Sequence, residues 1–179
     1  MTRSNIQRIL TAGSAVLALS CDTARVAGPL ADARTLTRSE QGITSSARPF
    51  SCPTKQASSS TAEVGPLGGL LTAGGMSVSI PAGALLSTVT VTLTVPASNN
   101  VEIDVSVAGT EHFVFEQPIV VTMSYARCAR SNIDLAPISA WYFDPATGKL
   151  LEQMPGVDDK LLRTVTFSTG HLSGYILAN

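Results

Sequence analysis

Three consecutive residues near the C-terminus, His171-Leu172-Ser173, have the types and spacing that self-cleavage of a peptide bond requires. The Ser173 hydroxyl would attack the carbonyl carbon of Leu172 in an N→O acyl shift, and the imidazole of His171 would accept the hydroxyl proton. Water would then hydrolyse the ester and leave the tail Ser173–Asn179 as a separate peptide, still paired in its sheet. Backbone strain at a tight bend would help to drive this shift.

A structural interpretation of the same residues competes with this chemistry. In it, His171 belongs to a loop, Ser173 begins the last strand, and Tyr175 and Leu177 pack inward. Gly174 gives the backbone slack, not strain, at the position after the serine. The sequence therefore favours the structural interpretation, and cleavage between Leu172 and Ser173 is kept as an alternative.

Cys52 and Cys128 are the only cysteines of the chain apart from Cys21. In an exported protein, an even pair is most simply explained by a disulfide bond. A metal-binding pair would need histidine partners nearby in the sequence, and there are none. We therefore predict a Cys52–Cys128 disulfide.

Three adjacent aromatic residues, Trp141, Tyr142 and Phe143, must point to alternating faces if they lie in a strand. One or two of them must pack in the core. The others, chiefly Trp141 and Tyr142, offer a small stacking platform for a carbohydrate, although core packing is the favoured interpretation.

The remaining polar candidates point to structure. His112 fits a half-exposed strand residue better than a metal ligand. Asp158-Asp159 fits a turn better than a calcium site, because a calcium site needs more converging oxygen atoms. No glycine-rich loop leads into a helix, so nucleotide binding is not supported. We predict no catalytic residue besides the His171–Ser173 alternative, no cofactor and no metal.

The composition of the chain is that of one globular domain with additional segments. Its 179 residues are 44% hydrophobic and 14% charged, with a formal net charge of −1. There is no basic stripe that would neutralise phosphates, so nucleic acid is not expected as a partner.

The N-terminal segment 1–20 has the pattern of a secretory signal peptide. Arg3 and Arg8 precede a short apolar run at 9–19, which is too short to anchor the chain. The sequence Leu17-Ala18-Leu19-Ser20-Cys21 resembles the bacterial lipobox, in which the cysteine is lipidated and becomes N-terminal. The alternative is ordinary signal-peptidase cleavage after Ser20. The resemblance implies an exported protein held to a bacterial envelope membrane by acyl chains on Cys21.

Two further segments follow. Residues 21–58 are rich in Ser, Thr, Ala and Arg and have no periodicity, which predicts a flexible tether. Residues 59–179 contain about ten short runs of alternating apolar and polar residues, with turn signals between them and no helical period. This pattern predicts an all-β fold, an antiparallel β-sandwich of immunoglobulin-like type. The expected strands are 60–64, two short strands punctuated by Gly68-Gly69 and Gly74-Gly75, 76–80, 89–95, 101–107, 111–116, 118–125, 138–143, 149–153, 162–168 and 173–178.

The domain also resembles a known family. The runs Gly65–Gly69 and Val78–Leu85 resemble the opening of the ZU-five domain, the β-sandwich of zonula occludens proteins, netrin receptors and ankyrins. Phe115–Pro118, Ser124–Cys128 and His171–Tyr175 resemble motifs of ZU-five-like domains in bacterial secreted proteins and lipoproteins of unknown function. The His171-Leu172-Ser173 site also resembles the cleavage site of certain self-processing ZU-five proteins and adhesion receptors. This resemblance implies a sandwich fold and carries over no partner or activity.

The sequence thus predicts an envelope lipoprotein whose domain is a non-catalytic binding or structural module, with an unknown protein or glycan partner. A self-cleaving domain and a carbohydrate-binding module are the alternatives.

Overall fold

The computed structural model describes residues 46–53, 56–129 and 137–179. Within these ranges the chain forms eleven strands. They are β1 (Ser58–Val64), β2 (Gly69–Ala73), β3 (Met76–Ile80), β4 (Val89–Val95), β5 (Glu102–Val107), β6 (Val114–Ser124), β7 (Ser139–Phe143), β8 (Leu150–Gln153), β9 (Gly156–Asp159), β10 (Thr164–His171) and β11 (Gly174–Ala178).

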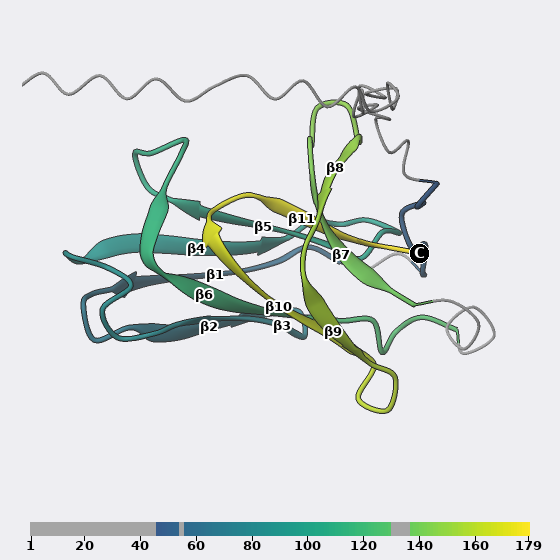
Figure 1. Cartoon of the computed structure of the whole chain (residues 1–179), viewed down its shortest axis with the longest axis horizontal. Coiled ribbons are helices and arrows are strands. Elements are labelled where there is room, and N and C mark those ends of the chain that lie inside the picture. Colours follow the sequence, from purple (N-terminus) through teal and green to yellow (C-terminus); the bar gives the residue numbers. More distant parts are fainter. Residues whose placement is uncertain (1–45, 54–55, 130–136) are drawn as a thin grey trace, which may run out of the picture. The chain divides into compact units, whose positions relative to one another are not determined.

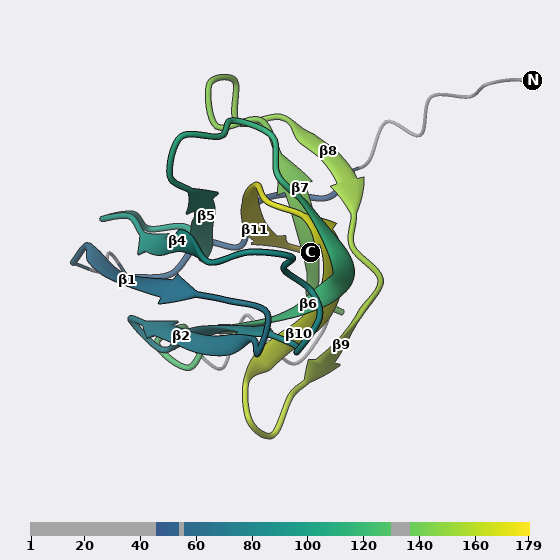
Figure 2. The same cartoon turned by 90° about the vertical axis from the view of Figure 1, so that its left-hand side faces the viewer.

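The strands form two sheets that pack face to face (Figures 1 and 2). One sheet has six strands in the order β1-β4-β5-β11-β7-β8, and the other has five in the order β2-β3-β6-β10-β9. Neighbouring strands are antiparallel throughout both sheets. The predicted all-β antiparallel sandwich is confirmed.

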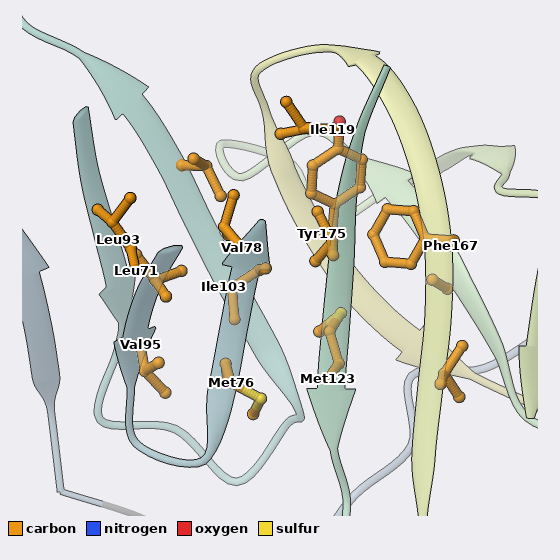
Figure 3. Close-up of a cluster of buried hydrophobic side chains, with 14 of the residues drawn as sticks. Leu71, Met76, Val78, Leu93, Val95, Ile103, Ile119, Met123, Phe167 and Tyr175 are labelled. Atoms are coloured by element: carbon orange, nitrogen blue, oxygen red, sulfur yellow. The ribbon is translucent and has the colours of Figure 1, made fainter. Parts of the chain in front are cut away.

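The alternating sequence pattern explains why these segments are strands. In β4, Val91, Leu93 and Val95 are buried, and the threonines between them are half-buried on the outer face. Side chains from both sheets meet in the core, as Figure 3 shows for Leu71, Ile103 and Phe167 among others. On the outer faces, threonine hydroxyls pair across strands at 3.0 Å, Thr61 with Thr92 and Thr122 with Thr166.

The two sides of the sandwich are closed by the chain itself. On one side, the edge strand β1 continues into β2 of the other sheet, and on the opposite side β8 continues into β9 (Figure 2). At the first side, Gly68 has a φ of 76° and approaches the Ile80 carbonyl so closely that a Cβ would collide with it. The amide of Gly83 also donates to the Pro66 carbonyl at 2.8 Å. The two glycine-containing turns of the domain opening therefore support each other.

Two strand predictions were wrong. The expected strands 111–116 and 118–125 are replaced by a single strand, β6, which continues past Pro118. The proline has no N–H for the ladder, and the register with β10 shifts in this region, between Thr169 and His171. The edge strand β9 was not predicted, because its sequence Gly156–Asp159 has no alternating apolar pattern.

Part of the segment predicted as a tether, 21–58, belongs to the folded domain. Pro49 bridges Ala178 and Ser51 bridges Asn100, and the amide of Phe50 donates to the Leu177 carbonyl at 2.7 Å. The Phe50 side chain is buried in the core. The sandwich therefore begins before the predicted boundary at residue 59, because backbone pairing outweighs the polar composition there. The predicted signal peptide 1–20, Cys21 and the tether up to residue 45 lie outside the described residues.

The predicted disulfide joins Cys52 to Cys128, with their Cα atoms 4.8 Å apart. It ties the N-terminal segment to the turn that follows β6. The guanidinium of Arg127 donates to the backbone carbonyls of Pro53, Ser98 and Asn100 around it. The arginine therefore joins the same two segments as the disulfide and connects them to a third, at residues 98–100.

We expect reduction of the Cys52–Cys128 disulfide to lower the free energy of unfolding by about 2–4 kcal/mol, because the bond restricts the unfolded chain. The sequence separation of 76 residues makes the closed loop long. Urea denaturation of the protein with and without reductant measures the loss. The double variant Cys52→Ser/Cys128→Ser is the control and should show no response to reductant. Two reactive thiols in the untreated protein would contradict the prediction.

Candidate functional site

The His171-Leu172-Ser173 segment is the crossover between the two sheets. β10 ends at His171 in the five-stranded sheet, and β11 begins at Gly174 in the six-stranded sheet. Its backbone is fixed by hydrogen bonds at each residue. Tyr175 Oη donates to the His171 carbonyl at 2.8 Å, the amide of Leu172 donates to Phe113, and the Ser173 carbonyl accepts from Val105.

The predicted self-cleavage residues are neighbours in the chain, but their side chains are not joined for proton transfer. The His171 imidazole lies edge-to-face against the Tyr142 ring, with centroids 5.6 Å apart. Within the described part of the chain, Ser173 Oγ makes no hydrogen bond, to His171 or to any other residue. Leu172 is buried, and none of the three residues has a left-handed φ. The crossover therefore lacks both the hydroxyl–base hydrogen bond and the backbone strain that would favour the reaction.

A groove of about 370 Å³ opens beside Ser173. It lies between β5, the connection from β5 to β6, the end of β7 and the crossover. Figure 1 shows the β5–β6 connection and the β7–β8 hairpin rising from the same side of the molecule. The polar residues that line the groove are Asp104, Ser106, Thr110, Glu111, His112, Tyr142 and Ser173.

Gly174 and Phe143 shape the floor of this groove. Gly174 pairs with Asp104 of β5, so both positions lie on the outer face of the six-stranded sheet. A Cβ on Gly174 would lie 2.9 Å from Cε1 of Phe143, which shows that the phenyl ring packs directly over the glycine. The glycine after the serine is thus explained by packing as well as by backbone freedom.

The aromatic residues of β7 alternate between faces, as predicted. Tyr142 pairs with Tyr175 and packs partly against the core, and Trp141 pairs with Ile176 on the outer face. Phe143 is buried at 8% exposure. Trp141 is half-buried and does not line the groove. The three rings therefore do not form one stacking platform.

The charge at the groove is negative. Its lining residues include two carboxylates, Asp104 and Glu111, and no lysine or arginine. Partial burial raises the pKa of the Asp104 carboxyl above its ordinary value. Such a shift arises because no donor or cation near Asp104 compensates for the water that its carboxylate loses. His112, predicted as a half-exposed strand residue, is exposed in the connection before β6 and lines the same groove.

The carboxylates of Asp158 and Asp159 are both engaged in contacts within the domain. Asp158 accepts hydrogen bonds from Tyr125 Oη at 2.6 Å and from the amide of Ile138 at 3.0 Å, and its carboxylate lies 2.8 Å from Lys160 Nζ. Asp159 Oδ1 accepts from the amides of the following turn, those of Leu161 and Leu162. Among the residues that the structure describes, no group of three His, Cys, Asp or Glu side chains is arranged to hold a metal ion.

Two features of the structure have no signal in the sequence. The alternation in 101–107 places Asp104 on the solvent side of its strand, but its position in a groove depends on residues far away in the chain. Arg127 and Arg163, which bind backbone carbonyls around the disulfide, stand in irregular segments without a pattern.

Comparison with known proteins leaves the family open. No protein-family model matches the chain, and no curated protein sequence is significantly similar to it. In the described part of the chain there is no helix long and apolar enough to cross a membrane.

We expect the chain to remain uncut at Leu172-Ser173, because Ser173 Oγ has no base bonded to it. Intact mass of the purified native protein, before and after prolonged incubation, measures this. Ser173→Ala is the control and should give the same pattern of species. A fragment that ends at Leu172 in the wild type and is absent from Ser173→Ala would contradict the prediction.

Asp158 makes stability depend on pH. Burial tends to raise the pKa of its carboxyl, but hydrogen bonds from Lys160, Tyr125 and the Ile138 amide lower it by more, so the net shift is downward. The stability that the carboxylate contributes is therefore present above its unfolded pKa of about 4 and is lost as pH falls through the folded value.

We expect Asp158→Asn to lower the free energy of unfolding by about 1–3 kcal/mol at neutral pH and to flatten its decline below about pH 4. Urea denaturation at a series of pH values measures both effects. Asp144→Asn is the matched control: this exposed carboxylate is bonded only within its own turn, so its loss should change stability much less. Equal acid sensitivity of Asp158→Asn and wild type would show that the interpretation is wrong.

Proposed function

We propose that this chain is an envelope lipoprotein of a bacterium, anchored through Cys21, whose β-sandwich is a non-catalytic binding or structural module. The observation that carries the proposal is the N-terminal pattern, with Arg3 and Arg8, an apolar run at 9–19 and a cysteine at position 21. The Cys52–Cys128 disulfide supports it, since such bonds persist in oxidising compartments outside the cytosol.

The described crossover has no hydrogen bond between a hydroxyl and a base, and this supports a non-catalytic role. His171 packs against a tyrosine ring and Ser173 Oγ has no hydrogen bond in the described structure, so self-cleavage has less support. We further propose that the domain is ZU-five-like. Two parts of that resemblance, the Gly65–Gly69 opening and the bend at 81–84, contact each other through the Gly83–Pro66 hydrogen bond.

The anchor is tested by expressing the full chain in a bacterial host with labelled palmitate. We expect the wild type to carry the label and to sediment with membranes until detergent is added, because acyl chains on Cys21 bury their methylenes in the bilayer. The Cys21→Ser variant should lose both the label and the sedimentation. The Cys52→Ser/Cys128→Ser variant is the control for cysteine loss and should keep the label.

The binding role is tested with the soluble exported form of Cys21→Ser, incubated with isolated envelope material. We expect it to sediment with that material. A wild type that carries no label and remains soluble would contradict the anchor. A Cys21→Ser protein that sediments with none of the envelope fractions would contradict the binding role.

A further inference from the structure

We propose that the groove beside the β10–β11 crossover is a binding site for a sugar unit of a neutral glycan, with Asp104 as its principal hydrogen-bond acceptor. The inference rests on the proposed binding function and deepens it by naming a site and a ligand class. The site is centred on Asp104 and Ser173, and of the two aromatic residues that the sequence suggested it includes Tyr142 but not Trp141.

The size of the groove fits a small ligand. Its volume of about 370 Å³ is near the lower end of the range of about 300–1,000 Å³ that ligand sites occupy. The Phe143 ring fills the space over Gly174 and forms an apolar wall of the groove. A short stretch of a sugar chain can therefore lie beside this ring, next to Asp104 and Ser173.

The polar side chains of the groove are available to a ligand. Asp104, Ser106, Thr110 and Ser173 line it, and none of these four side chains makes a hydrogen bond within the described part of the chain. The three hydroxyl groups both donate and accept, and the carboxylate accepts. Sugar hydroxyls also do both, so this mixture suits a sugar better than a cation, which needs acceptors alone.

The charge of the groove selects among sugars. Two carboxylates and no lysine or arginine line it, so a phosphate, a uronic acid or another anion would be repelled. A neutral sugar has donors that can bond to the exposed Asp104 carboxylate. The raised pKa of that carboxyl agrees with an acceptor that lacks a donor.

The side of the site formed by β5 and the crossover is held by backbone pairing. Asp104 and Gly174 are paired residues of neighbouring strands, and the Ser173 carbonyl accepts from the amide of Val105 at 3.2 Å. The groups that would contact the sugar are thus positioned before it binds, which reduces the entropic cost of binding.

The experiment uses the soluble exported form of Cys21→Ser and isothermal titration with three probes: N-acetylglucosamine oligomers, glucose oligomers and a polyuronate. We expect binding to at least one neutral series and none to the polyuronate. Asp104→Asn should weaken binding about tenfold or more, since hydrogen bonds to charged groups are the stronger ones. Glu102→Gln is the matched control, two residues along the same strand on the same face but outside the groove, and should bind as the parent does.

Trp141→Leu separates the two possible positions of a sugar. It should leave the affinity unchanged, and thermal unfolding of every variant verifies that the fold is intact. Loss of binding in Trp141→Leu but not in Asp104→Asn would overturn the groove site. Binding of the polyuronate, or of a lysine-rich peptide in place of the sugars, would overturn the ligand class. No binding to any neutral probe would overturn the inference, and the proposed function would still stand if the same protein sediments with envelope material.

Discussion

The burial of β11 is the constraint on which the rest of the structure depends. All five of its residues are buried, and it pairs with β5 on one side and β7 on the other. Tyr175 and Leu177 pack in the core, and the Phe143 ring covers Gly174 on the outer face. The only side-chain polar atom of the strand, Tyr175 Oη, lies 2.9 Å from Thr169 Oγ1 and 2.8 Å from the His171 carbonyl. Burial raises its pKa to about 12, so it remains a neutral donor.

This burial dictates the crossover that precedes the strand. β10 belongs to the opposite sheet, so the chain must pass between the layers within Leu172 and Ser173. Leu172 fills the core during the passage, and Ser173 emerges at the groove. The same residues that suggest self-cleavage are therefore explained by packing: an apolar residue inside, a polar residue at the surface, and a glycine beneath Phe143.

Sequence reasoning captured what depends on local pattern. The alternation in 89–95 predicted β4 with its observed bounds, and the two spare cysteines predicted the disulfide. It failed where backbone pairing between segments distant in the sequence determines the structure. Pro118 looked like a strand start, yet β6 begins at Val114 and already pairs there with His171 of β10. The segment around Phe50 has no period, and its structure comes from bridges to Asn100 and Ala178. The groove combines Asp104, Phe143 and Ser173, which only the sheet order brings together.

The strap of residues 48–52 also relates the proposed anchor to the proposed site. It joins the domain where β5 begins, through the Ser51–Asn100 bridge and the Cys52–Cys128 disulfide. The groove extends past the other end of β5, at Val107 and Thr110. At about 3.3 Å of rise per residue, these points are about 20 Å apart along the strand. Figure 1 shows the strap and the β5–β6 connection at opposite ends of the sheet. The strap and the part of the groove at Thr110 therefore lie at opposite ends of β5.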